Sequence, residues 1–77
     1  MPTLPQVPVR SPEALGRAIR AARAQAGLTQ AELAERARAN RFGIVQLEAG
    51  KETRALEVIF DALATLGLEL TVRPRSG

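Results

Sequence analysis

The side chains that could do chemistry in this chain of 77 residues are guanidinium, carboxylate, hydroxyl and amide groups, because cysteine and histidine are both absent. Without those two residue types, a disulfide framework, a Cys/His zinc site and nucleophilic catalysis with a histidine base are excluded. Eleven basic residues, ten of them arginine, oppose eight acidic residues and give a net charge of +3. This balance favours a polyanionic partner. We therefore expect a binding module that is not an enzyme and uses no cofactor and no metal.

The hydrophobic residues predict only a small core. They make up 45% of the chain, but fourteen of them are alanine and only two are phenylalanine. Alanine buries little area, and apolar burial contributes only about 25 cal/mol per Å². A domain of this length is near the lower limit for folding alone, so we expect a homodimer. No apolar run approaches the roughly 20 residues of a membrane span and no segment resembles a signal peptide, which predicts a cytoplasmic protein.

The first ten residues predict an extended arm, either disordered or strand-like. Residues 1–10 contain three prolines and show no helical period. Val7 and Val9 alternate with other residues and could pair with the edge of a sheet. A loose tail is the simpler interpretation.

Capping residues predict where the first helix begins and ends. Ser11 is a good N-cap, and Pro12 follows it at a position where a missing N–H costs nothing. Gly27 supplies a left-handed stop. Between them an apolar stripe recurs at helical spacing and consists of Leu15, Ile19, Ala22 and Ala26. The pattern predicts one amphipathic helix between Ser11 and Gly27.

Two short helices separated by a break at 37–39 are expected next. Thr29 and Glu32 have the spacing of a capping box, which marks the start of the first of these helices. Asn40 offers a fresh N-cap for the second, and Gly50 ends it. Two short helices joined by a tight break predict a helix-turn-helix.

A fourth helix is expected from about Thr53 or Ala55 to Leu66, and a strand follows it. The residues of this helix that are predicted to face inward are Leu56, Ile59, Phe60, Leu63 and Leu66. From residue 68 to 72 the apolar period changes from 3.6 to 2, which is typical of a half-buried strand. The chain offers no second convincing strand, so the simplest partner is the same strand of a second copy. Leu68, Leu70 and Val72 would then form an antiparallel ribbon across a two-fold axis.

The stretch from Thr29-Gln30-Ala31-Glu32-Leu33-Ala34 to Ile44-Val45-Gln46-Leu47-Glu48-Ala49-Gly50 resembles the Xre/Cro-type helix-turn-helix family. The family pattern is T-Q-x-x-L-A followed by I-x-x-x-E-x-G. The resemblance covers residues 11–66 and implies an all-α fold with a small β element, a lambda-repressor-like domain of four helices. Residues 1–10 would be its arm and 67–77 its dimerisation strand and tail. Such a strand is similar to the end of HipB-type antitoxins, where it is swapped between protomers.

In the resembled geometry, the helix that begins at Asn40 lies in the major groove with its first turns against base edges. Arg41 is then placed to bind guanine and Gln46 to bind adenine. Phe42 would press on a thymine methyl, unless it is a core or interface aromatic. Phosphate contacts would come from Gln30, Asn40, Lys51, Thr53 and Arg54. The alternative for the charged residues among these is that they are ordinary solvated surface side chains.

Two further positions match or depart from the family pattern. Arg23 and Glu48 match a buried arginine–glutamate pair that ties the first helix to the third. Arg38 stands where the family often has glycine, so a left-handed turn there would cost roughly 1 kcal/mol or would be re-formed.

The resemblance implies a homodimeric, sequence-specific DNA-binding repressor that is also the antitoxin of a HipA-like kinase toxin and regulates its own promoter. A free-standing regulator with no toxin partner is one alternative. A toxin-masking module that has lost DNA binding is another, and the unusual Gly43 and Val45 in the reading helix keep it open.

Overall fold

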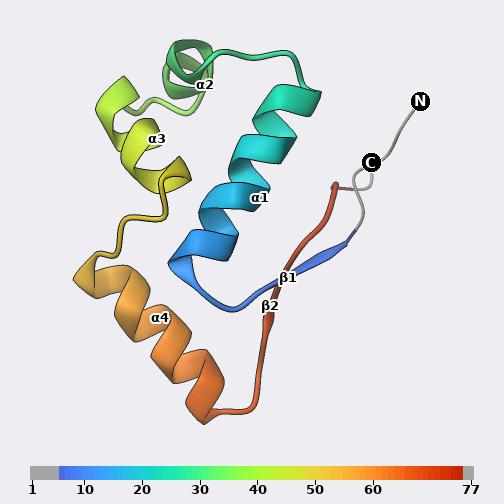
Figure 1. Cartoon of the computed structure of the whole chain (residues 1–77), viewed down its shortest axis with the longest axis vertical. Helices are drawn as coiled ribbons and strands as arrows, with labels where there is room; N and C mark the ends of the chain where they lie inside the picture. The colour runs from blue at the N-terminus through green and yellow to red at the C-terminus, as the bar shows by residue number, and fades with distance from the viewer. Residues whose placement is uncertain (1–5, 76–77) are drawn as a thin grey trace.

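The computed structural model describes residues 6–75 and contains four helices and two short strands (Figure 1). In chain order these are β1 (Val7–Val9), α1 (Pro12–Gln25), α2 (Gln30–Arg36), α3 (Arg41–Glu48), α4 (Arg54–Thr65) and β2 (Leu70–Val72). The expected fold class, all-α with a small β element and a helix-turn-helix, is confirmed. Residues 1–5 of the expected arm and 76–77 of the tail lie outside the described residues. No helix in the described part of the chain is long and apolar enough to cross a membrane.

Local capping explains why the helices begin where they do. The Ser11 hydroxyl accepts a hydrogen bond from the Ala14 amide at 3.1 Å, and Thr53 caps α4 in the same way. Thr29 and Glu32 form both bonds of the expected capping box, at 3.0 and 2.8 Å. Each cap satisfies an amide that the first turn of a helix would otherwise leave without a partner. The helix starts are therefore encoded by single polar residues.

The expectation that the chain lacks a second strand is wrong. β1 and β2 pair antiparallel within one chain, with Val7 opposite Val72 and Val9 opposite Leu70. Val9 is completely buried. The alternation of Val7 and Val9 allowed such a pairing, but a three-residue segment with Pro8 at its centre is too short and too proline-rich for this pattern to identify a strand. The pairing that Leu70 and Val72 were expected to find in a second copy is thus met inside the chain, and Leu68 lies before the strand.

The core is small, and α4 contributes less to it than its apolar stripe predicts. The buried hydrophobic residues among those described are Val9, Ala34, Ile44 and Phe60. Ile59 and Leu66, which were expected to face inward, are 46% and 70% exposed. The stripe of α4 is wider than the surface that the rest of this short chain can offer to cover it. One turn of α4, centred on Phe60, holds the helix in place.

α1 is the central element that connects the two ends of the domain. It contacts α3 on one side and β1 on another, so the α2–α3 pair and the strand pair lie at different ends of the molecule (Figure 1). Gly16 of α1 marks its closest approach to α3, because a Cβ built there would lie 2.5 Å from the Leu47 carbonyl oxygen. A glycine is required at this position. The backbones of α1 and α3 are consequently in direct contact.

Candidate DNA interface

The helix-turn-helix is formed by α2, a four-residue connection and α3. Ala34 and Ile44 are 3% and 6% exposed where the two helices pack together. In the connection, Arg38 has a φ of +57°, the left-handed conformation that usually favours glycine. The amide of Ala39 donates to the carbonyl of Ala34 at 2.9 Å and closes the turn. The chain therefore keeps the left-handed turn and accepts the conformational strain of a non-glycine residue.

One end of α3 is fastened by a charged network. Arg23 Nε and Nη2 donate to the Glu48 carboxylate at 2.6 and 3.0 Å, and the side chains are only 16% and 4% exposed. Arg23 also donates to the Leu28 carbonyl at 2.8 Å. These hydrogen bonds from Arg23 lower the pKa of Glu48 below its usual range and raise that of Arg23. The structure thus brings Arg23 and Glu48 together across α1 and α3, and the pair remains charged at neutral pH.

Gln30 belongs to the same network. Its Nε2 donates to Glu48 Oε1 at 3.1 Å, so the first residue of α2 is tied to the last residue of α3. The sequence interpretation gave Gln30 a phosphate contact and did not foresee this bond. The bond fixes the orientation of the amide and uses one of its two N–H groups.

The other end of α3 is free and exposed. Asn40 caps it by accepting a hydrogen bond from the Gly43 amide at 2.7 Å. Arg41 follows on the surface, and Phe42 is 70% exposed. This exposure excludes Phe42 from the core of the single chain. One turn further on, Val45 is 36% exposed and Gln46 is half-buried.

Basic side chains lie on the surface near both ends of α3. Arg36, Arg38 and Arg41 lie on the surface between the end of α2 and the start of α3, and no acidic residue separates them. Lys51 and Arg54 are exposed beyond the end of α3, and Arg54 Nη1 lies 3.4 Å from Glu57 Oε2. Sequence interpretation missed Arg36 and Arg38 as interface residues, although three arginines within six residues were a visible signal. We call these five residues the basic rim.

The remaining expected phosphate contact, Thr53, is exposed but its hydroxyl caps α4 by accepting from the Leu56 amide at 3.3 Å. Asn40 and Thr53 therefore have local structural roles that do not depend on a ligand. The structure brings Asn40, Arg41 and Phe42 together at the free end of α3, whereas Lys51, Thr53 and Arg54 follow its fastened end.

A comparison with protein families matches residues 14–75 to one described as a helix-turn-helix domain. No curated protein and no solved structure matches the chain. The match begins within α1 and runs past β2, so it includes the network, the turn and the exposed helix just described. Because it covers most of the sequence, the chain belongs to the helix-turn-helix domain family, a family of DNA-binding domains.

Proposed function

We propose that the protein is a sequence-specific transcriptional repressor whose α3 reads operator DNA in the major groove. The observation that supports this most is the polarity of α3. Its last residue, Glu48, is buried and bonded to α1, while Arg41 and Phe42 at its start project from the surface inside the basic rim. A rigidly held helix with a free, cation-flanked N-terminal half is what a major-groove reader requires.

The proposed contacts fall into two groups. Arg41 binds the O6 and N7 atoms of guanine with its two-pronged guanidinium, and Gln46 binds adenine with its amide. Lys51, Thr53 and Arg54 contact phosphates beyond α3, and Asn40 and Gln30 contact phosphates beside it. The exposed positions of Arg41, Lys51 and Arg54 support these roles because nothing in the described structure covers them.

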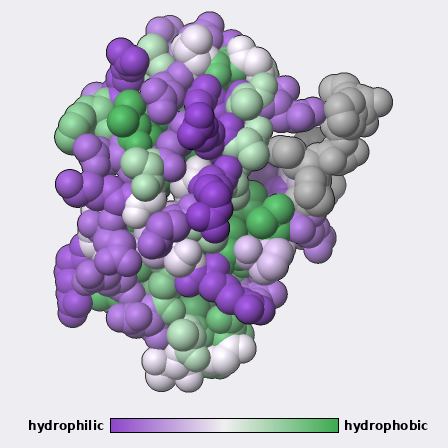
Figure 2. All heavy atoms as spheres, viewed as in Figure 1, coloured by the Kyte–Doolittle hydropathy of each residue, from purple (hydrophilic) through white to green (hydrophobic). Residues whose placement is uncertain are grey.

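We propose that two copies bind one operator as a homodimer. A dimer places two α3 helices about 34 Å apart, one turn of DNA, so the operator is an inverted repeat. The apolar surface of α4 and the segment after it supports this, since Val58, Ile59, Leu66 and Leu68 are 46–70% exposed. In Figure 2, hydrophobic residues gather over the part of the molecule where α4 and the strands lie. Exposed apolar residues that gather on one face are typical of a surface that contacts another protein.

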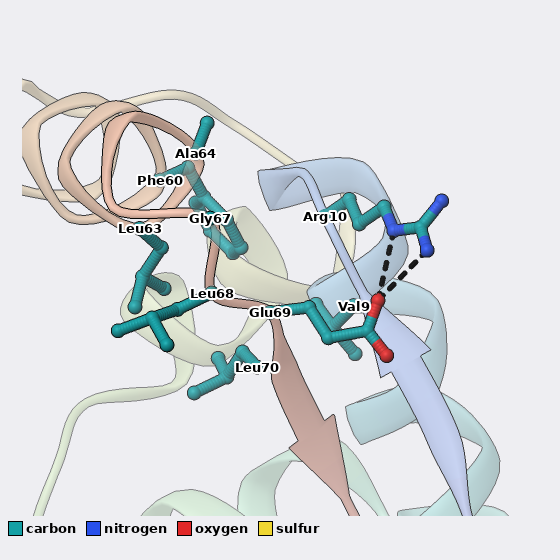
Figure 3. Close-up of a pocket in the computed structure, with 9 residues that line it drawn as sticks. All are labelled: Val9, Arg10, Phe60, Leu63, Ala64, Gly67, Leu68, Glu69 and Leu70. Carbon is teal, nitrogen blue, oxygen red and sulfur yellow. Dashed lines mark hydrogen bonds and ion pairs between the residues drawn. The ribbon is translucent and has the colours of Figure 1, made fainter.

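A groove beside this face offers a place for the second copy. Its volume is about 360 Å³, and Phe60, Leu63 and Leu68 lie along it, with Val9 and Leu70 of the strand pair on the other side (Figure 3). The ion pair between Arg10 and Glu69, at 2.8 Å, lies at its rim. A dimer through this face is an alternative to the strand ribbon, which could use only the edge of β2 that β1 does not occupy.

The finer role that we propose is that of an antitoxin to a HipA-like kinase toxin, with autoregulation of the shared promoter. It is supported by the strand that follows the fourth helix, which is similar to the end of HipB-type antitoxins, on a domain whose residues 11–66 resemble the Xre/Cro-type family. A free-standing regulator is the alternative. A kinase-like reading frame beside this gene, and a stable complex between the two products, decide for the antitoxin.

Binding titrations test the repressor proposal. Wild type and variants are titrated against promoter DNA upstream of the gene and against scrambled DNA at several salt concentrations. Arg41→Ala should weaken operator binding by about 1–3 kcal/mol and relax preference at one base position. Lys51→Ala should weaken binding to both duplexes and reduce the salt slope. Arg73→Ala, which removes an exposed arginine after β2, is the matched control.

The outcomes separate the proposed functions. If Arg41→Ala and Arg73→Ala have the same small effect on both duplexes, α3 is not the reading helix. If the wild-type protein has no salt-dependent affinity for either duplex, the repressor proposal fails and the toxin-masking alternative replaces it.

A further inference from the structure

An apolar stripe runs along the exposed side of α3. Phe42, Val45 and Ala49 have the spacing i, i+3 and i+7, which places them on one face of a helix. All three are exposed, and Phe42, at 70%, is one of only two aromatic residues in the chain. The stripe is separate from the apolar face of α4, because the other exposed large hydrophobic residues described all lie between Val58 and Leu70.

The surroundings of this stripe decide what it can contact. Three arginines, Arg36, Arg38 and Arg41, lie between the end of α2 and the start of α3 with one exposed acidic neighbour, Glu35, and Glu48 at the other end of α3 is buried in its pair with Arg23. A partner for this surface must therefore be anionic overall and still present apolar groups between its charges. Duplex DNA has this combination, with phosphates on both edges of a groove whose floor carries the bases.

The chemistry of the major groove then identifies the apolar group. Each base pair displays hydrogen-bond donors and acceptors there, and the apolar group that it displays is the C5-methyl of thymine. Phe42 and Val45 can neither donate nor accept a hydrogen bond through their side chains. We infer that α3 reads its operator partly through methyl groups, with Phe42 and Val45 each packing on the C5-methyl of a thymine. This inference rests on the proposed entry of α3 into the major groove.

Gly43 is consistent with this mode of reading. It lies between Phe42 and Val45 in sequence and is exposed, and a Cβ at that position would meet only the Asn40 side chain, at 3.3 Å. The absence of a side chain keeps the surface beside Phe42 open for close approach of a base edge. The same contact chemistry accepts 5-methylcytosine, because its methyl group occupies the corresponding position on the pyrimidine ring. Cytosine methylation at these positions should therefore partly replace thymine.

Replacing thymine by deoxyuridine tests the inference, since this removes the methyl group and leaves every hydrogen-bonding group in place. The operator is first located by footprinting on promoter DNA, and each thymine of a half-site is then replaced in turn. A methyl group packed on Phe42 or Val45 should be worth about fourfold in Kd, which corresponds to about 0.8 kcal/mol. Two thymine positions per half-site should respond to the replacement. If cytosine is placed at one of these positions, affinity should fall, and replacing that cytosine by 5-methylcytosine should recover affinity.

Two variants assign the effect to the stripe. In Phe42→Ala, the operators with thymine and deoxyuridine should bind equally at one position, because the protein no longer touches that methyl group. Arg41→Ala is the control and should bind both operators more weakly while keeping the fourfold ratio between them. Since Phe42 is 70% exposed, its replacement should leave the melting temperature unchanged.

The results distinguish this inference from the proposed function. Wild-type protein that binds its operator equally tightly with thymine and with deoxyuridine at every position overturns the methyl reading and leaves the repressor intact. If Phe42→Ala also binds DNA as wild type does, the stripe is a contact surface for another protein and the inference is wrong. Protein with no affinity for any duplex overturns both.

Discussion

Replacing Glu48 by alanine should show how much of the stability depends on the network that fastens α3. The carboxylate accepts bonds from Arg23 Nε, Arg23 Nη2 and Gln30 Nε2 at 2.6, 3.0 and 3.1 Å. Removing one partner of a buried ion pair costs about 3–5 kcal/mol, because the remaining charge has lost its partner. Arg23 keeps its bond to the Leu28 carbonyl and its partial exposure, so we expect the lower value, about 3 kcal/mol.

Thermal denaturation followed by circular dichroism measures this loss. For a domain of this size, 1 kcal/mol corresponds to roughly 4–8 °C in Tm, so Glu48→Ala should melt at least about 12 °C below wild type. Glu35→Ala, which removes an exposed glutamate of α2 with the same charge, should melt within a few degrees of wild type. If the two variants melt alike, the Arg23–Glu48 pair does not stabilise the fold and our account of α3 is incorrect.

The same pair should make stability depend on pH. The hydrogen bonds from Arg23 lower the pKa of Glu48 in the folded state. Their stabilisation is therefore complete above the unfolded pKa of about 4.3 and is lost as the pH falls through the lower, folded pKa. The stability difference between wild type and Glu48→Gln should be constant from neutral pH down to about 5 and should shrink below about 4. A difference that does not change with pH would contradict this linkage.

Three other substitutions test separate features of the fold. Gly16→Ala should lower the free energy of unfolding by about 1–3 kcal/mol in a denaturant titration, because its Cβ would lie 2.5 Å from the Leu47 carbonyl oxygen; unchanged stability would mean that α1 and α3 can separate. Arg38→Gly should raise stability by about 0.5–1 kcal/mol by relieving the left-handed φ of +57°, while weakening DNA binding through the lost cation. Leu66→Glu places a charge on a side chain that is 70% exposed, so the helix content should be kept while sedimentation shows a monomer; a persistent dimer would exclude this part of α4 from the interface.

The sequence was sufficient to predict structure wherever a single residue determines the conformation of the few residues next to it. Ser11, Thr29 and Asn40 act as caps through bonds to amides three residues away, so their effect was predicted without any tertiary structure. Thr53 caps α4 in the same way, although the sequence analysis expected it to contact phosphate. For the candidate site, the Asn40 cap places Arg41 and Phe42 in the first turn of α3, but the sequence left open whether Phe42 belongs to a core, and its exposure is seen only in the structure.

The errors arose where partners are distant in sequence. The sequence allowed either a strand or a loose tail at Val7–Val9, and only the pairing with Leu70–Val72 decides for the strand. The exposure of Leu66 could not be predicted either. An apolar stripe shows which side of a helix favours burial, but it does not show whether other elements of a short chain can cover that side. The bond between Gln30 and Glu48 joins residues that share no local pattern, so composition and spacing contain no sign of it.

The pairing of β1 with β2 has a consequence for the order in which the domain matures during synthesis. The first of the two strands is synthesised before α1 to α4, and its partner is synthesised after them. Translation proceeds at about 5–20 residues per second, so Val9 remains without its native contacts for several seconds while α1 to α4 form. The helix-turn-helix depends on contacts between α1, α2 and α3 and can fold in that interval. In a nascent chain, α3 should therefore be formed and packed against α1 and α2 before β1 and β2 pair.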